Sequence, residues 1–245
     1  MIRIENLTCK YDNEEAISNI NLEIKEGESV ALIGPNGSGK SSFLKLINGL
    51  IEPSEGKFYL LDEEITKKKL ANNVFSKKFH QKMGFIFQNS DSQLFCPLVY
   101  EEVAFGPSQM GLSMEEVNKR TLDSLELLRI KHLMHRVPYH LSGGEKKKVA
   151  IASVLSMNPQ VIIMDEPMNG MDPKSKKFLK ELLIKLNKAG KTIICATHDF
   201  EYVDGIFERA IVFSEEHKII RDGNYEEIIS DEEFLKEHNI RLCSS

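Results

Sequence analysis

The chain has 245 residues, of which 41% are hydrophobic and 28% are charged, so it can form one large globular domain with a substantial core. Its formal net charge is -5, from 32 basic and 37 acidic residues, and this balance argues against a dedicated nucleic-acid-binding protein, which usually carries a basic excess. No apolar run approaches the roughly 18 residues that a membrane-spanning helix requires, so action at a membrane would need another chain.

The first quarter of the chain is predicted to hold strands and one helix. Apolar residues alternate with polar ones over residues 2–7 and 17–24, which predicts antiparallel strands joined by a polar turn at 11–15. The early charge and the alternation at the start also exclude a signal peptide. Further elements are expected as a buried strand at 29–33, a helix from Lys40 to about 48–49 and a short strand at 57–61.

The sequence between the strand at 29–33 and the helix after it is Gly-Pro-Asn-Gly-Ser-Gly-Lys-Ser, at residues 34–41. Its glycines let the backbone turn with N–H groups pointing inward, and the helix that begins at Lys40 presents its positive end to an anion. Lys40 is expected to reach the outer phosphates of a nucleotide, and Ser41 to bind Mg²⁺, as in a P-loop. The predicted nucleotide-binding residues here are Gly34, Pro35, Asn36, Gly37, Ser38, Gly39, Lys40, Ser41 and Ser42.

The middle of the chain is predicted to change from strand to helix. A helix is expected at 74–82 and a buried strand at 83–87. This strand ends at Gln88, whose neutral amide can bind Mg²⁺ or water. From residue 98 to 157 the pattern is helical, with a capping box at 113–116.

The sequence Leu-Ser-Gly-Gly-Glu at 141–145 interrupts this helical pattern before a further helix at 146–157. Ser142 is suited to cap a helix, and the two glycines that follow favour a second anion-binding helix N-terminus. A plain capping box is the other interpretation, because Glu145 lies three residues after Ser142. One nucleotide does not obviously need two anion-binding helix N-termini.

The last third of the chain returns to strands. Buried strands are expected at 161–165 and 192–197, and the helix between them, at 173–189, has a proline at its start and Gly190 at its end. This succession is typical of a parallel sheet with crossover helices. The remainder is expected to form edge strands at 209–213 and 218–222 and closing helices within 225–239.

Polar side chains follow two of these strands at the edge of the sheet where ligands bind in α/β folds. Asp165 is placed to hold Mg²⁺ across from Ser41, and Glu166 can polarise an attacking water molecule. His198 follows the next strand and is expected to contact the γ-phosphate. The four isolated cysteines, Cys9, Cys96, Cys195 and Cys243, have the spacing of neither a metal site nor a disulfide framework, which favours a reducing, intracellular compartment.

At these residues the sequence resembles the ATP-binding subunits of ABC transporters over essentially its whole length, and the segment 141–145 is the most specific of the shared motifs. The resemblance implies an α/β fold: a P-loop NTPase, RecA-like core with an antiparallel β subdomain and an inserted α-helical signature subdomain. The domain 1–245 would consist of a core, at about 1–88 and 159–245, and a helical subdomain at about 89–158.

The family resemblance also implies ATP and Mg²⁺ as cofactors, ATP hydrolysis as the activity, and catalytic roles for Lys40, Glu166 and His198. Two subunits of the family stack head to tail, so that Ser142, Gly143, Gly144 and Glu145 would serve the ATP held by the partner subunit's Lys40. The remaining roles are adenine stacking for Tyr11, the Q-loop glutamine for Gln88, the catalytic base for Glu166, the D-loop aspartate for Asp172 and the switch histidine for His198; the implied metal ligands are Ser41, Gln88 and Asp165.

A narrower match covers Phe-Gln-Asn-Ser-Asp-Ser-Gln-Leu-Phe at 87–95 and Glu-Glu-Val-Ala-Phe-Gly-Pro at 101–107. These segments are similar to the ATPases of energy-coupling factor importers, which take up cobalt, nickel or vitamins. The similarity implies a second ATPase subunit, identical or related, an integral membrane coupling protein and a substrate-capture protein. The chain would then lie at the cytoplasmic face of the cell membrane as a peripheral subunit, without nucleic acid.

Two other functions fit the P-loop. A soluble ABC ATPase acting on nucleic acid or ribosomes would typically add long coiled coils or a second cassette, and this sequence contains neither. A P-loop kinase would need a pocket for the phosphate acceptor, and it would not explain the segment 141–145.

Overall fold

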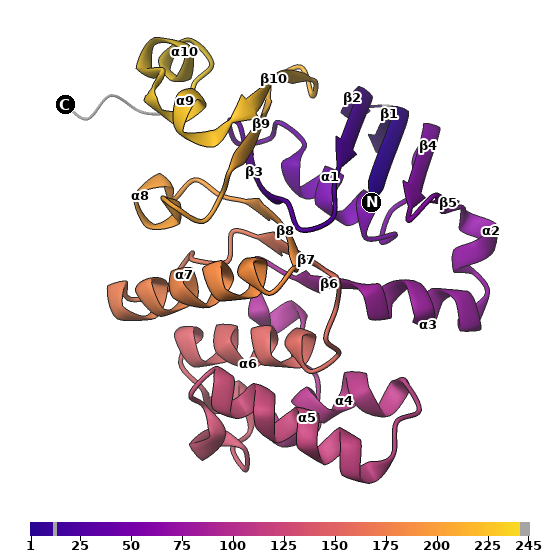
Figure 1. The fold of residues 1–245 in the computed structure, drawn as a ribbon, viewed down its shortest axis with the longest axis vertical. Coiled ribbons are helices and arrows are strands. Elements are labelled where there is room, and N and C mark those ends of the chain that lie inside the picture. The colour runs from indigo at the N-terminus through magenta and orange to yellow at the C-terminus, as the bar shows by residue number, and fades with distance from the viewer. Residues whose placement is uncertain (12–13, 241–245) are drawn as a thin grey trace.

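The computed structural model describes residues 1–11 and 14–240, and of Tyr11 and Glu201 it describes the backbone alone. Six strands form its central sheet in the order β10-β9-β3-β8-β7-β6 (Figure 1). All neighbouring pairs are parallel except β9 and β10. Their bounds are Ser29–Ile33 for β3, Met83–Ile86 for β6, Val161–Asp165 for β7, Thr192–Ala196 for β8, Arg209–Phe213 for β9 and Ile219–Asn224 for β10.

A second sheet is antiparallel and has the order β2-β1-β4-β5. Helix α1 (Lys40–Ile47) lies between the two sheets (Figure 1), and its Phe43 and Leu44 are fully buried there. The strands are Ile2–Tyr11 for β1, Glu14–Ile24 for β2, Glu55–Leu60 for β4 and Glu63–Glu64 for β5.

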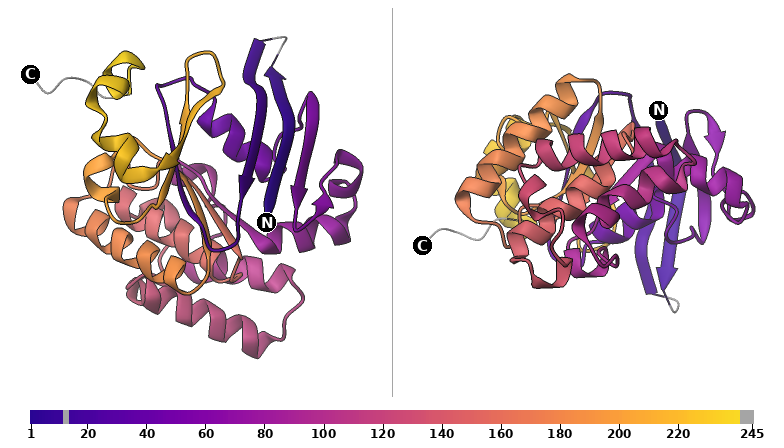
Figure 2. Two further views of the ribbon diagram at one scale, coloured as in Figure 1. Left: turned by 45° about the horizontal axis from the view of Figure 1, so that its top comes forward. Right: turned by 90° about the horizontal axis from the view of Figure 1, so that it is seen from below.

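Helices cover the other face of the central sheet. Helices α4 to α6 form a layer below it, on the side away from the antiparallel sheet (Figures 1 and 2), and α4 contacts both α5 and α6. The helices are Lys67–Leu70 for α2, Asn73–Lys82 for α3, Val99–Gln109 for α4, Met114–Leu127 for α5, Gly143–Leu155 for α6, Pro173–Lys188 for α7, Phe200–Val203 for α8, Tyr225–Ser230 for α9 and Glu232–Glu237 for α10.

The central strands separate two apolar cores because alternate side chains of a strand point to opposite faces. In β3, Val30 and Leu32 pack with α1 and the antiparallel sheet, whereas Ala31 and Ile33 pack with the helices on the other side. Strands buried on both faces have continuous apolar sequences, and for this reason the sequence predicted 29–33 and 161–165 to the residue.

Two expectations were wrong. The helix expected at 146–157 begins at Gly143 and ends at Leu155, because Ser142 and Glu145 form a capping box that starts the helix before the two glycines. The strand at 209–213 is not at an edge, since it pairs with β3 on one side and with β10 on the other. The turn predicted at 11–15 lies partly, and Cys243 wholly, outside the described residues. The boundaries near residues 88 and 158 between core and helical subdomain stay a prediction.

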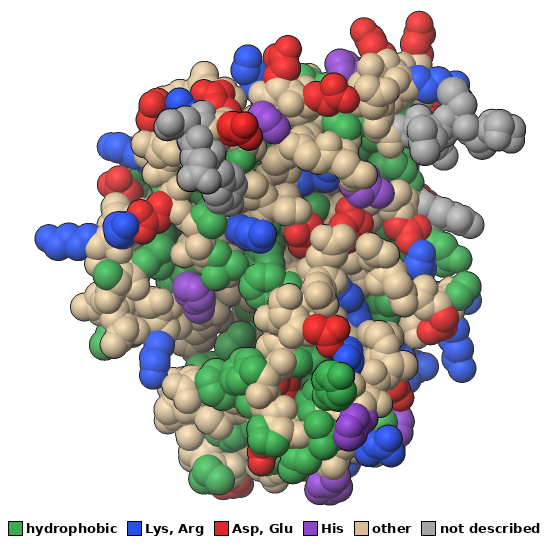
Figure 3. All heavy atoms as spheres, turned by 180° about the vertical axis from the view of Figure 1, so that it is seen from behind, with side chains coloured by type: hydrophobic (Ala, Val, Ile, Leu, Met, Phe, Trp, Pro, Cys, Tyr) green, Lys and Arg blue, Asp and Glu red, His purple; other side chains and the backbone are tan. Residues whose placement is uncertain are grey.

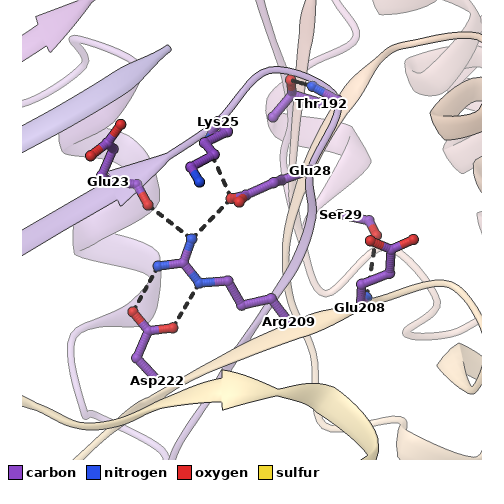
Figure 4. A network of polar contacts seen from close by, with 9 residues as sticks. Glu23, Lys25, Glu28, Ser29, Thr192, Glu208, Arg209 and Asp222 are labelled. Carbon is purple, nitrogen blue, oxygen red and sulfur yellow. Dashed lines mark hydrogen bonds and ion pairs between the residues drawn. The ribbon is translucent and has the colours of Figure 1, made fainter.

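Arg209 closes the amino-terminal end of the parallel strands (Figure 4). Its guanidinium group donates two hydrogen bonds of 2.7 Å to the carboxylate of Asp222, and one of 2.9 Å each to Glu28 Oε2 and the carbonyl of Glu23. The hydrogen bond to Asp222 raises the pKa of Arg209 above its usual range. Because Glu23 belongs to β2 and Asp222 to β10, this group joins the two sheets.

No helix in the ranges 1–11 and 14–240 is long and apolar enough to cross a membrane.

Candidate functional site

A cavity of about 780 Å³ opens at the carboxyl edge of the central sheet. Figure 3 shows acidic, basic and histidine side chains gathered near the middle of the face opposite to that of Figure 1. The cavity lies where the loop after β3, the end of β7 and the end of β8 meet. Of the predicted site residues it is lined by Asn36, Gly37, Ser38, Gly39, Lys40, Ser41, Ser42, Gln88, Asp165, Glu166 and His198.

The loop between β3 and α1 has a shape that only glycine permits at two positions. Gly34 has a φ of 151°, and a Cβ atom there would lie 2.5 Å from the carbonyl oxygen of Phe213. Gly39 has a φ of 97°, and its Cβ atom would lie 2.1 Å from the carbonyl oxygen of Ala16. Gly39 is the N-cap of α1 and makes no side-chain capping bond, so the positive end of this helix faces the cavity uncapped.

Lys40 is only 6% exposed, and its Nζ atom donates to the carbonyl oxygens of Gly34 and Pro35, both at 2.8 Å. Burial lowers the pKa of Lys40, and the nearby carboxylates of Glu166 and Asp165 oppose this effect. A buried ammonium group held by two carbonyls is ready to exchange them for a stronger acceptor. Phosphate oxygens are such acceptors.

Asp165 ends β7 and is 6% exposed, and its Oδ1 atom accepts a hydrogen bond of 3.1 Å from the hydroxyl of Ser41. The prediction placed these side chains across from each other, and the structure brings them together. A hydroxyl and a carboxylate oxygen are a donor set that suits Mg²⁺, which prefers oxygen ligands and retains several waters. The residues present therefore fit this ion. Gln88, the third predicted ligand, is exposed and lines the same cavity.

Glu166 and His198 lie side by side at the ends of β7 and β8. The backbone N–H of His198 donates to Glu166 Oε2 at 3.3 Å, and Nε2 of His198 lies 3.3 Å from Oε1 of Glu166. Oε1 is buried and, within the described residues, accepts no hydrogen bond. Burial, reinforced by Asp165, raises the pKa of Glu166 to about 7, against the effects of the His198 N–H and Lys40. Such a carboxylate can take a proton from water near neutral pH.

His198 is suited to be neutral beside this carboxylate. Its pKa is lowered by burial and by the charge of Lys40. A neutral imidazole can donate or accept a hydrogen bond in the cavity without adding charge.

Apart from Gly34 and Pro35, whose carbonyls accept hydrogen bonds from Lys40, two groups of predicted residues do not line this cavity. Asp172 is the N-cap of α7, where it accepts hydrogen bonds from the N–H of Ser175 at 3.0 Å and from its hydroxyl at 2.6 Å. Ser142 caps α6, and Oε2 of Glu145 accepts from the N–H of Ser142 at 2.9 Å and from its hydroxyl at 2.7 Å. The hydrogen bonds from Ser142 lower the pKa of Glu145. The predicted stacking of Tyr11 on adenine concerns a side chain outside the described part.

The glycines at the start of α6 differ from those of the first loop. A Cβ atom on Gly143 or Gly144 would meet no atom within 4 Å, and neither residue is in the left-handed region. The fold of this chain therefore does not require glycine at either position. Bare backbone at a helix start admits close approach by another molecule.

Sequence reasoning missed several residues of the cavity. Asn169 and Gly170 follow β7, and Asp199 follows His198, so their proximity to strand ends was a signal for them. Lys176 on α7, which forms an ion pair with Asp199, and His217 in the turn after β9 belong to no motif, and only the fold brings them to the cavity.

Comparisons with known proteins identify relatives of this chain. A family model described as ABC transporter matches residues 17–169. A Clostridium acetobutylicum protein named as an ABC transporter ATP-binding protein is 62% identical over 98% of this chain and 100% of its own length. The nickel import ATP-binding protein LarO of Lactiplantibacillus plantarum is 43% identical, over 91% of this chain and 92% of its own. The energy-coupling factor transporter ATP-binding protein EcfA of Methanosphaera stadtmanae is 42% identical, over 99% and 86% respectively.

Solved structures of ATP-binding cassettes are also similar to this chain. The structure of cbiO1 from Clostridium perfringens, described as part of the ABC transporter complex cbiONQ, has a TM-score of 0.81 and 36% identity and covers 98% of this chain and 95% of its own. A dimeric post-hydrolysis state of the ATP-binding cassette MJ0796, bound to ADP and phosphate, has a TM-score of 0.82 and 33% identity, with coverage of 91% and 98%. These matches confirm the fold class predicted from the sequence.

Proposed function

The chain belongs to the ABC transporter family, and we propose that it is the ATP-binding and ATP-hydrolysing subunit that energises a membrane importer of the energy-coupling factor type. The observation that carries the proposal is the division of the anion-binding groups between two places. The cavity at α1 holds Lys40, Asp165 and Glu166, whereas the glycines of α6 lie outside it. A helix start that can bind phosphate but has no catalytic group beside it is suited to bind the nucleotide held by another subunit.

Each residue of the cavity has a separate role in phosphoryl transfer to water. Lys40 exchanges the carbonyls of Gly34 and Pro35 for the outer phosphates of ATP. Ser41 and Asp165, with Gln88, would hold Mg²⁺, which when bound neutralises charge on the phosphates. Glu166 accepts the proton of the attacking water, and His198 contacts the γ-phosphate beside it. Most of the rate enhancement of such a site comes from positioning and charge stabilisation.

Two copies of the chain, or one copy and a related subunit, would pair head to tail. In this arrangement Ser142, Gly143 and Gly144 of one subunit meet the ATP held by the partner, and Asp172 lies at the interface. The dimeric state of the cassette MJ0796, which shares the fold, supports the pairing. Closure on two Mg-ATP molecules and reopening after hydrolysis would drive transport.

An apolar groove on the surface supports the proposal of a membrane protein partner. The groove has a volume of about 340 Å³ and lies between α3, β6, α4 and α6. Phe95 and Phe105 line it, are 67% and 43% exposed, and stack edge to face with ring centroids 4.9 Å apart. Figure 3 shows hydrophobic side chains gathered on the lower half of the molecule. A short helix of the coupling protein would fill this groove, which would make the chain a peripheral subunit at the cytoplasmic face.

The test is to purify the tagged chain from its own cells after solubilising the membranes in mild detergent. We expect mass spectrometry to find a polytopic membrane protein and, if the native pair is a heterodimer, a related ATPase subunit as well. Recovery from the soluble fraction alone, with ribosomes or nucleic acid, would favour the soluble ABC ATPase instead.

Phe105→Glu should release the chain from the membrane while leaving nucleotide binding intact. Leu127→Glu, on α5 outside the groove and similarly exposed at 45%, is the matched control and should stay bound.

A further inference from the structure

Lys147 is a buried lysine to which the mechanism above gives no role. It lies on α6, in the second turn after Ser142, and is 3% exposed. Its Nζ atom donates to the carbonyl oxygen of Gln88 at 2.6 Å and to that of Phe87 at 3.1 Å. Both carbonyls belong to the segment that leaves β6 and carries Gln88 to the cavity.

Packing does not explain a lysine at this position. Among the described residues no carboxylate forms an ion pair with Lys147, and its charge is buried against backbone carbonyls. A buried charge without a close partner is less favourable than an apolar side chain of similar volume. Burial lowers the pKa of Lys147, while the charges of Asp165 and Glu166 oppose the effect, so the ammonium group lies within electrostatic reach of the site.

A second side chain binds the same segment to the same helix. Gln93 accepts a hydrogen bond of 3.2 Å from the N–H of Phe87 and donates one of 3.0 Å to the carbonyl of Ala150 on α6. The segment is therefore tied to α6 at both of its ends. These hydrogen bonds couple the position of the Gln88 backbone to that of α6.

We propose that Lys147 is a positioning residue, which holds Gln88 at the edge of the nucleotide cavity and makes its position depend on α6. The helix would thereby connect the two ATP sites of a dimer. Its N-terminus, at Ser142, meets the partner's nucleotide, and Lys147 on the same helix sets a residue that faces the chain's own nucleotide. This step rests on the proposed function, since it needs ATP to be hydrolysed between two subunits.

Lys147→Met and Lys147→Gln form a matched pair, because methionine and glutamine have similar length but only glutamine donates hydrogen bonds. We expect Lys147→Met to lower kcat for ATP by about tenfold or more with KM changed less than about threefold, and Lys147→Gln to keep kcat within about threefold of wild type. Lys146→Met is the control on the same helix. Lys146 pairs with the exposed Asp91, and such pairs contribute little.

A double-mutant cycle tests whether Lys147 acts through Gln88. If it does, Lys147→Met added to Gln88→Ala lowers kcat by less than about twofold beyond Gln88→Ala alone. Fully additive effects, or a wild-type kcat for Lys147→Met, would overturn the proposal. If the methionine variant does not fold, Lys147→Ala replaces it, because the smaller side chain leaves room for water to solvate the two carbonyls.

Failure of this inference can be told apart from failure of the proposed function. Every comparison above is made relative to an active wild type whose hydrolysis requires Glu166. If Glu166→Gln kept normal turnover, the proposed mechanism would fail whatever Lys147 did. If Glu166→Gln were inactive and Lys147→Met fully active, the positioning role alone would fail.

Discussion

Helices α1 and α6 both begin beside glycines, and the two beginnings are built differently. Gly39, the N-cap of α1, is left-handed and makes no side-chain capping bond, so the start of this helix is open. Ser142, the N-cap of α6, forms a complete capping box with Glu145. In the free chain α1 is ready for an anion, whereas at the start of α6 the N–H of Glu145 already has a partner within the chain, the hydroxyl of Ser142.

The glycines at the two helix starts repeat this contrast, as do Glu166 in the cavity at α1 and Glu145 in the first turn of α6. Gly39 is required by its own fold, because a Cβ atom would clash with the carbonyl of Ala16, whereas Gly144 has open space around it. Burial raises the pKa of Glu166 to about 7, whereas hydrogen bonds from Ser142 lower the pKa of Glu145. The first helix start is shaped by contacts within its own fold, whereas the space around the second is open to another molecule.

The largest expected effect comes from removing the charge at α1. Lys40→Met should weaken ATP binding by about 10- to 100-fold, since a hydrogen bond to a charged group contributes about 1.5–3 kcal/mol, and should lower hydrolysis by at least about 100-fold. Fluorescence titration with a labelled nucleotide and a phosphate-release assay measure the two effects. Lys45→Met, in the last turn of the same helix, is the control and should bind normally. Normal binding by Lys40→Met would mean that the α1 cavity is not the nucleotide site.

A smaller effect is expected at α6, where one substitution should raise stability and lower turnover. Gly144→Ala should raise the free energy of unfolding by up to about 1 kcal/mol, because alanine favours a helix more than glycine does and nothing obstructs its Cβ atom. The same methyl group should lower turnover by about tenfold by keeping the partner's nucleotide away from the backbone. Chemical denaturation and steady-state kinetics check the two parts. Loss of stability in Gly144→Ala would contradict the contrast with Gly39.

The smallest effect on turnover concerns protonation, because near neutral pH Glu166 titrates and Glu145 does not. With a pKa of about 7 for Glu166, kcat should fall by up to about tenfold from pH 8 to pH 6. The raised pKa means that the folded chain holds a proton that the unfolded chain releases from about pH 4.5, so the free energy of unfolding falls as pH rises to 7.

Glu166→Gln tests the stability part of this prediction. The substitution should stabilise the chain by roughly 2–3 kcal/mol above pH 7 and remove the contribution of this carboxyl to the pH dependence of unfolding between about pH 4.5 and 7. Thermal unfolding at pH 5 and pH 8 measures both quantities. A variant less stable than wild type at pH 8 would show that burial does not raise the pKa of Glu166.

Much of the site could be predicted from the sequence because parallel strands end at one edge. The apolar run at 161–165 placed Asp165, and the run that follows placed His198, at the edge where the loop of Lys40 lies. That argument needs the direction of the strands and not their order. The order of the strands could not be predicted, because a short apolar run such as 209–213 has the same sequence pattern at the edge of a sheet and in its middle.

Two features escaped prediction for physical reasons. The glycines at 143–144 have low helix propensity and indicated a break, but the capping bonds of Ser142 offset that propensity and the helix includes them. Lys147 carries no motif and is one of three successive lysines, at 146–148. Its role follows from the packing of α6 against the end of β6, which depends on contacts between residues about 60 apart in the chain.

The central position of β3 has a consequence for synthesis of the protein on the ribosome. β3 pairs with β8 and β9, and the contact of Gly27 with Thr192 at this end of the sheet spans 165 residues. At about 5–20 residues per second, the ribosome needs roughly 8 to 30 s to make that length. Until then β3 is an apolar strand with two unpaired edges, which other nascent chains can join. Chaperone protection of the nascent chain is therefore needed most before the last quarter of the chain emerges.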